Sequence, residues 1–409
     1  MTLSWREHIS QAVDRRFDEI VALRRHLHQH PEPSGEEFKT SLLLYQQLSD
    51  AGFNVRLGTE GRGVVADFPS NRNDATVAAE QAPRCLALRA DIDALCIHDE
   101  KQVPYRSCRE GVMHACGHDA HTAILMGAIR VLHEADQEGA LPWPVNIRGI
   151  FQPAEETCLG AIEMIEAGAV EGVDAIIALH VEPMRPVGDI GVRLGVMTAH
   201  CDDVQILVHG RGGHAARPHE AADPIAAALQ LITSLYLYIP RVTDSREAVV
   251  VTIGEIHGGN NHNVIPETVL LRGTLRTLQD DVRQQTMEHI RRIAVGVAQA
   301  GDTKIKVDFT AGPDSVNNDT ALVDLLREVG KDLLGSDCVE EIALPSMGGE
   351  DFSYYLQHVP GAMFRLGSAL RKHAVGLHAP TFDIDEEALR IGAKMLATTA
   401  VLWFDPTRS

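Results

Sequence analysis

Short apolar runs alternate with helical patterns through the first half of the chain, from about residue 10 to residue 190. The β-rich runs are VVADF at 64–68, CLALRA at 85–90, VNIRGIF at 145–151 and DAIIALH at 174–180. Alternation of this kind is typical of a sheet whose parallel strands are joined by helices. We therefore predict an α/β domain with a mostly parallel sheet and helices on both faces.

The order of the elements changes between about residues 195 and 311. The pattern there predicts strands at 203–209, 248–256, 268–277 and 304–309, and helices at 224–238 and 281–299. This strand-helix-strand-strand-helix-strand order is that of a compact, ferredoxin-like α+β domain. Asp223 is placed to cap the first of these helices, and Pro224 to occupy its first turn.

Helical patterns resume at 321–334 and 385–404, after the region with the changed order. The chain is thus predicted to return to its first domain. We expect a discontinuous main domain of residues 1–194 and 312–409, with residues 195–311 inserted as a satellite domain. Residues 69–83 are polar and predict a mobile loop.

The sequence MHACGHDAH at 113–121 holds the densest set of candidate ligands. Cys116 and His118 are ligand types that borderline-soft divalent metals prefer. A closed structural zinc site would need a second pair of this kind, but the other cysteines form no C-x-x-C pair. The missing ligands should be histidines and carboxylates, which favours an open, catalytic metal site.

Candidates for these ligands follow two of the predicted strands. Glu155 and Glu156 come after the run at 145–151, and His180 ends the run at 174–180. Loops at the carboxyl ends of strands gather ligands at one edge of an open α/β sheet. Adjacent glutamates in an extended loop point in opposite directions, so one can bind metal while the other acts as general base. His378, in GLHAP, is the last candidate ligand.

Asp91 and Asp93 follow a third strand and, being two residues apart, share a face. We expect them to orient ligand imidazoles rather than to bind the ion directly. His121 lies one helical turn after His118 and is also expected to support the site. A single Cys or His is usually structural, but Cys116 stands beside His118, Glu156 and His180, and this grouping favours a metal site. His214, read alone, can be a surface loop residue.

Composition limits the function classes. The chain has 409 residues, of which 44% are hydrophobic and 23% charged, enough for two domains. Its net charge of −20 argues against a nucleic-acid partner. We see no secretion signal and no apolar run near the length that spans a bilayer, so we expect a cytoplasmic protein without a membrane partner. Seven cysteines, an odd number, indicate reduced thiols.

Seven motifs in one order resemble the amidohydrolase branch of the co-catalytic metal aminoacylase and carboxypeptidase family, which includes hippurate hydrolases and indoleacetyl-amino acid hydrolases. The motifs are LRADIDAL at 88–95, MHACGHDAH at 113–121, FQPAEE at 151–156, GRGGHAARPHEAADPI at 210–225, HNVIPE at 262–267, GGEDFSYY at 348–355 and GLHAP at 376–380. The resemblance covers nearly the whole chain.

The resemblance implies one or two divalent ions per subunit. It leaves the identity of the ion open among zinc, manganese, cobalt and nickel. It implies the general base Glu155 and the metal ligands Cys116, His118, Glu156, His180 and His378. Sister branches carry a metal-binding histidine where this chain has Asp91, and a bridging aspartate where it has Cys116. The occupancy of the second metal position is therefore left open.

The inserted domain is implied to act as a lid and as a dimerisation domain. His214 and Asn263 match positions that stabilise a developing oxyanion, with His214 reaching into the site of a partner subunit in a homodimer or dimer-based oligomer. Arg276 matches a position that grips the substrate carboxylate.

The resemblance implies hydrolysis of the amide bond in N-acyl amino acids to a carboxylic acid and a free amino acid. A dipeptidase and an N-carbamoyl amino acid hydrolase are alternatives on the same scaffold. A non-catalytic homologue that binds such conjugates is a further alternative, from which we would expect a broken ligand set or a missing base.

Overall fold

The computed structural model describes residues 3–68, 84–370 and 375–408, so the predicted loop at 69–83 lies outside the described residues. The chain forms two compact units. The main unit consists of Met1–Gly195, Asn317–Ala343 and Asp351–Ser409, and the inserted unit of Val196–Val316 and Leu344–Glu350.

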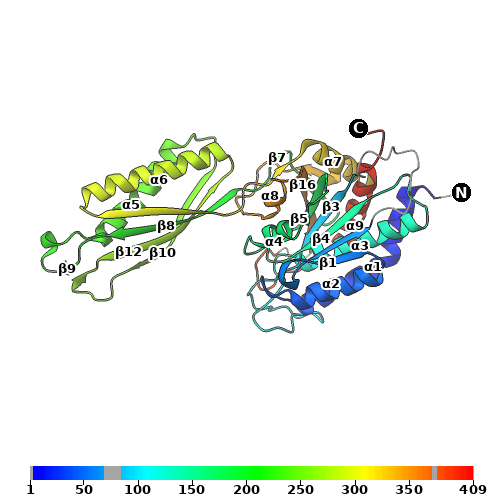
Figure 1. The fold of residues 1–409 in the computed structure, drawn as a ribbon, viewed down its shortest axis with the longest axis horizontal. Coiled ribbons are helices and arrows are strands. Elements are labelled where there is room, and N and C mark those ends of the chain that lie inside the picture. Colours follow the sequence, from blue (N-terminus) through cyan, green and yellow to red (C-terminus); the bar gives the residue numbers. More distant parts are fainter. Residues whose placement is uncertain (1–2, 69–83, 371–374, 409) are drawn as a thin grey trace. The chain divides into compact units, whose positions relative to one another are not determined.

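The main unit is built on a sheet of eight strands in the order β1-β2-β4-β3-β5-β16-β6-β15 (Figure 1). Their bounds are β1 (Asn54–Leu57), β2 (Val64–Phe68), β3 (Leu86–Asp91), β4 (Ile147–Gln152), β5 (Ala175–Pro186), β6 (Ile190–Val192), β15 (Val339–Glu341) and β16 (Gly361–Ala369). The central strands β4, β3, β5 and β16 pair in parallel, while β1, β2 and β6 make antiparallel pairs. The predicted α/β class with a mostly parallel sheet is confirmed.

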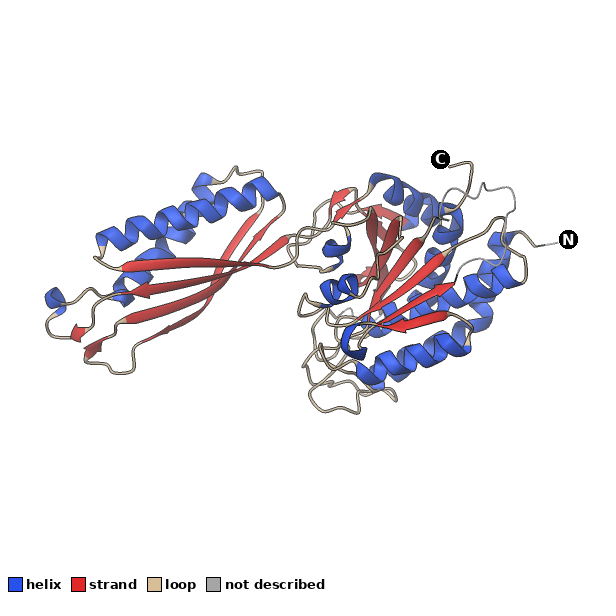
Figure 2. Ribbon diagram, in the orientation of Figure 1, coloured by secondary structure: helices blue, strands red, loops and turns tan. Residues whose placement is uncertain are grey.

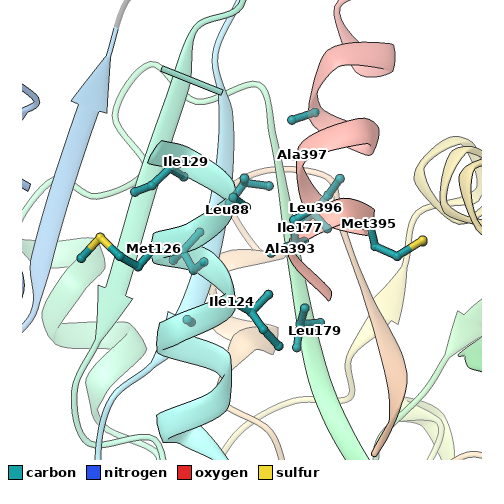
Figure 3. Packing of buried hydrophobic residues seen from close by; sticks show 14 of the residues in the cluster. Leu88, Ile124, Met126, Ile129, Ile177, Leu179, Ala393, Met395, Leu396 and Ala397 are labelled. Atoms are coloured by element: carbon teal, nitrogen blue, oxygen red, sulfur yellow. The ribbon is translucent and has the colours of Figure 1, made fainter. Parts of the chain in front are cut away.

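The main unit has helices that pack against this sheet and helices that pack on those (Figure 2). They are α1 (Trp5–Gln29), α2 (Phe38–Asp50), α3 (His118–Gln137), α4 (Gly160–Glu166), α7 (Thr320–Leu334), α8 (Phe352–Tyr355) and α9 (Glu387–Trp403). Side chains of α3, α9, β3 and β5 meet in the core, including the fully buried Leu88, Ile124 and Ile177 (Figure 3). The core thus fixes α3, which begins at His118, against the central strands.

The inserted unit has an antiparallel sheet of four strands in the order β10-β12-β8-β13. Its elements are β8 (His200–His209), β9 (Gly213–His214), α5 (Pro224–Val242), β10 (Val249–Gly258), β11 (Val264–Ile265), β12 (Thr268–Thr277), α6 (Asp280–Ala300) and β13 (Lys304–Ala311). Helices α5 and α6 cover the sheet (Figure 1), and the Asp223 side chain caps α5 by accepting from the backbone N–H of Ile225 and Ala226. The predicted ferredoxin-like α+β domain is confirmed.

Helix α5 corrects one expectation from the sequence. It is apolar on two faces: Leu231 and Leu235 are buried in the core of the inserted unit, whereas Leu229 and Leu237 are 67% and 63% exposed. Within the part of the chain that the structure describes, it is the one helix long and apolar enough to cross a membrane by length and composition alone. The expectation that no apolar run approaches this length was wrong.

Candidate metal centre

Cys116 and His118 lie on either side of Gly117, the N-cap residue that precedes helix α3. Gly117 has φ +90, and a Cβ atom there would meet Cγ2 of Val181 at 2.3 Å. Only glycine fits this left-handed turn beside β5 without displacing it. The backbone therefore places the Cys116 thiol and the His118 imidazole on the two sides of one tight turn.

The structure brings the five expected ligands into two groups that share one residue. In each group the candidate donor atoms lie within 4.8 Å of one another. The first group is Cys116, His118 and His180; the second is Cys116, Glu156 and His378. The sulfur of Cys116 is common to both groups.

Hydrogen bonds orient the two buried histidines. His118 Nδ1 lies 3.0 Å from both the carboxylate and the carbonyl oxygen of Asp93, and His180 Nδ1 lies 2.7 Å from the carbonyl oxygen of Val181. Both Nδ1 atoms must carry protons to donate to these oxygens, which leaves both Nε2 lone pairs available. His180 Nε2 lies 3.4 Å from Cys116 Sγ.

The donor chemistry fits a divalent metal ion. His118 Nε2 and Glu156 Oε1 are buried side-chain atoms without a hydrogen-bond partner among the described residues, a costly state unless a ligand satisfies them. Burial raises the pKa of the Cys116 thiol and the Glu156 carboxyl, so their charged forms need a nearby cation. Burial lowers the pKa of His180 well below its usual value, which keeps that imidazole neutral, as a metal ligand must be.

Asp91 and His121 form a further candidate donor group with His118, but hydrogen bonds within the chain already engage them. The Val181 backbone N–H donates to His121 Nε2 at 2.9 Å, so Nδ1 carries the proton and donates to Asp91 at 2.6 Å. Both ring nitrogens of His121 are thus engaged. Although burial opposes it, the neighbouring His118, His121 and Arg89 side chains, including the hydrogen bond from His121, hold the pKa of Asp91 well below its usual range.

Arg89 is a supporting residue that the sequence reading missed. It is 1% exposed within β3 and donates to Asp91 at 2.6 Å, to Gln152 at 2.8 Å and to Asp351 at 2.9 Å. A signal was available, because an arginine within an otherwise apolar, central strand must find buried partners. Its partners could not be read from spacing, since Asp351 lies far along the chain.

Glu155 and Glu156 differ in geometry from the expectation. Both approach the same atom: Glu155 Oε2 and Glu156 Oε1 each lie 3.8 Å from His118 Nε2. The opposite orientation predicted for an extended loop was wrong, because this loop is a turn. Ala154 and Cys158 flank the glutamates with φ +50 and +57, strained values for residues other than glycine that are common at functional sites.

The remaining expected residues lie in the inserted unit. His214 on β9 pairs with Val264 on β11, and the Ala215 N–H donates to the Asn263 carbonyl oxygen at 3.1 Å, so His214 and Asn263 are neighbours at the surface. The Ala216 N–H donates to His214 Nδ1 at 3.1 Å. Nε2 of this exposed histidine therefore carries the proton and is a hydrogen-bond donor.

Arg276 is half-buried on β12. Its Nη1 donates only to the carbonyl oxygen of Leu275, at 3.4 Å. Over residues 3–68, 84–370 and 375–408, no carboxylate forms an ion pair with it. The guanidinium is thus available to an acidic group from outside the chain.

An α/β scaffold, a buried group of Cys, His and Glu donors and a neighbouring carboxylate together define a metal-dependent hydrolase. Residues 87–401 match peptidase family M20/M25/M40, and the chain belongs to this family. The family resemblance predicted from the motifs is confirmed.

Three similar proteins place the chain within the family. It is 39% identical over 377 residues to the N-acetyl-L-cysteine deacetylase of Bacillus subtilis, covering 91% of this chain and 85% of that protein. It is 36% identical over 391 residues to the IAA-amino acid hydrolase ILR1-like 4 of Arabidopsis thaliana, covering 94% and 85%. The crystal structure of the Bacillus subtilis YXEP protein, a dinuclear metal-binding peptidase from the M20 family, matches with a TM-score of 0.80, 33% identity and coverage of 95% and 99%.

Proposed function

We propose that this hydrolase cleaves the amide bond of N-acyl amino acids and releases a carboxylic acid and a free amino acid. The observation that carries the proposal is the buried carboxylate of Glu155, 3.8 Å from His118 Nε2, beside the grouped metal donors. The names of the deacetylase and the IAA-amino acid hydrolase support this substrate class.

The proposed cofactor is a pair of divalent ions, with zinc and manganese the first to test, then cobalt and nickel. Cys116 would contact both ions, His118 and His180 would complete one group, and Glu156 and His378 the other. Bound ions lower the pKa of water towards neutrality and polarise the scissile carbonyl.

The side chains supply the proton transfers and the positioning. Glu155 takes the proton of the attacking water and later passes it to the nitrogen of the leaving amino acid. His214 Nε2–H and the Asn263 side-chain amide donate hydrogen bonds to the oxyanion, and each such donor contributes on the order of 10²-fold to 10³-fold in rate. Arg276 holds the substrate carboxylate.

We propose a homodimer in which His214 serves the active site of the partner subunit. The exposed apolar face of α5, with Leu229 and Leu237, supports this assembly because a large exposed apolar patch usually marks an interface. Strand β10 is an edge strand of the inserted sheet, and a two-fold axis can pair such an edge with itself. We place the dimer in the cytoplasm.

The test is amino acid release from N-acetyl, N-benzoyl, N-carbamoyl and dipeptide substrates by metal-stripped protein to which zinc, manganese, cobalt or nickel is restored. We expect metal-dependent release from N-acyl substrates, and a loss of about 10²-fold to 10⁴-fold in Glu155→Gln. The exposed Glu171→Gln is the matched control and should keep full activity.

The alternatives give different results in the same assay. Release confined to dipeptides or N-carbamoyl substrates would replace the N-acyl proposal. A conjugate-binding protein would bind substrate without release, but such a protein should lack a ligand or the base, and this chain has both.

A further inference from the structure

Arg24 on helix α1 lies at the centre of a buried ion cluster outside the metal centre. Its guanidinium is 0% exposed. Nε donates to Asp119 at 2.9 Å and Nη2 donates to Asp383 at 2.7 Å, with a longer contact of 3.4 Å from Nη1 to Glu386. One cation thus bridges two buried carboxylates.

Each of the two carboxylates belongs to a chain segment that carries a candidate metal donor. One segment lies in the first part of the main unit's sequence and the other in its last part. Asp119 directly follows His118 at the start of α3, whereas Asp383 lies five residues after His378 (383 − 378 = 5). Arg24 therefore ties the loop of His378 to the helix of His118.

Other bonds attach the same loop to its surroundings. The His378 N–H donates to the Ala115 carbonyl oxygen at 2.8 Å, and Tyr105 Oη donates to Asp383 at 2.8 Å. Lys101 Nζ donates to the Phe382 carbonyl oxygen at 2.7 Å. His378 itself has φ +62, a strained conformation that persists only when neighbouring contacts impose it.

His28 strengthens the attachment on the helix side. Its Nδ1 lies 2.7 Å from the same oxygen of Asp119 that Arg24 contacts. The helix side therefore has two attachments, while the guanidinium is the direct ionic link from Asp119 to Asp383. Removing one partner of a buried pair leaves the other charge uncompensated, which is strongly unfavourable.

We propose that Arg24 is a positioning residue that holds His378 in the donor group it forms with Cys116 and Glu156. The inference rests on the proposed two-ion function. It assigns the arginine to the ion bound through His378, because on the helix side Asp119 keeps its contact with His28, whereas the loop of His378 loses its ionic link to α3. Loss of the bridge should weaken the ion bound through His378 and leave the other in place.

The test is a zinc titration of the metal-free protein by calorimetry, with bound zinc counted after gel filtration. Arg24→Lys keeps the positive charge, but a single ammonium cannot reproduce the fork that spans two carboxylates. Asp383→Ala cuts the bridge from the loop side and carries the test if Arg24→Lys fails to fold. Glu386→Gln is the matched control: among the contacts of Arg24 it changes only the longest, and it otherwise weakens an ion pair with the exposed Arg25 outside the bridge.

We expect two zinc ions in the wild type and in Glu386→Gln. In Arg24→Lys and Asp383→Ala we expect one tightly bound ion and a second bound roughly 10- to 100-fold more weakly. Two ions at wild-type affinity in both variants would overturn the inference. So would loss of both ions from a variant that circular dichroism shows to be folded, because that result indicates general support of the fold. A wild type that binds one ion would contradict the two-ion proposal itself and remove the inference with it.

Discussion

Histidines in the main unit take different roles according to where their ring nitrogens are used. His118 and His180 donate through Nδ1 and keep Nε2 for a metal ion. His121 uses both nitrogens within the chain. His133 lies far along α3, with its ring 4.8 Å from that of Phe53 and 5.3 Å from that of Phe68, and serves packing.

His133 makes the fold sensitive to mild acid. Burial lowers its pKa from the usual value of 6.5, and its Nε2 accepts a hydrogen bond from Gln137. The unfolded chain therefore binds this proton more tightly than the folded chain. The contribution of the neutral His133 side chain to the free energy of unfolding is complete above pH 6.5. It decreases as the pH falls towards the lowered pKa, by no more than about 1.4 kcal/mol per pH unit.

We expect the free energy of unfolding to fall less between pH 7 and pH 5 in His133→Phe than in the wild type. Urea denaturation of metal-free protein at each pH measures the difference. His219→Phe, in which an exposed histidine is replaced, should follow the wild type. Parallel curves for the wild type and His133→Phe would contradict the assignment.

At the scale of elements, the junction before α3 depends on one glycine. In Gly117→Ala the new methyl group meets Val181 Cγ2 at 2.3 Å, in addition to the left-handed strain of about 1 to 2 kcal/mol. Overpacking of this kind costs about 1 to 3 kcal/mol more. Because the turn carries Cys116 and His118, we expect weaker zinc binding as well as lower stability.

Gly111→Ala separates the two effects. Gly111 has φ +73, but a Cβ atom there meets nothing within 4 Å. Gly111→Ala should be less stable by the backbone strain alone, and its zinc affinity should stay at the wild-type value. Denaturant unfolding and zinc titration of both variants check the prediction, and equal losses of stability would show that the contact with Val181 is relieved at no cost.

The sequence predicted most elements because their patterns are local. Both helices and all four main strands of the inserted unit fall where periodicity placed them. Strand β16, GAMFRLGSA at 361–369, was missed although it lies between β5 and β6. Glycines and Arg365 interrupt its apolar run, and its parallel pairing with β5 joins residues far apart in sequence, which no local pattern reveals.

The candidate donors were predicted from the sequence, and the structure brings them together, whereas their supporting contacts were not predicted. Cys116, His118 and His180 stand in motifs, so residue type and position indicated them. Arg24 has no such signal, because its partners lie 95 and 359 residues away. Ion pairs of that kind depend on the finished packing of the chain.

At the scale of the whole molecule, the proposed dimer predicts complementation between two inactive variants. Glu155→Gln lacks the base but keeps His214, and His214→Ala keeps the base. If His214 acts in the partner's site, each mixed dimer contains one complete site. Random exchange makes half of the dimers mixed, so we expect about a quarter of wild-type activity after the two are unfolded and refolded together.

The control is to mix the two variants without refolding, which should leave both inactive while subunits do not exchange. A double variant, Glu155→Gln with His214→Ala, refolded with an equal amount of wild type should give about half of the activity expected from dilution, because such a mixed dimer contains no complete site. Absence of recovery in mixed dimers of the two single variants would show that His214 serves its own subunit, and an active His214→Ala variant would show that His214 has no role.

The ribosome also synthesises the residues of the two donor groups at different times. Cys116, His118 and His180 are made before the inserted unit, whereas His378 is made after it. The 198 residues from His180 to His378 (378 − 180 = 198) take a ribosome roughly 10 to 40 seconds at about 5 to 20 residues per second. In the proposed two-ion site, the second position can form only after the segment around His378 has emerged, so a chain stopped before that residue should bind no more than one ion.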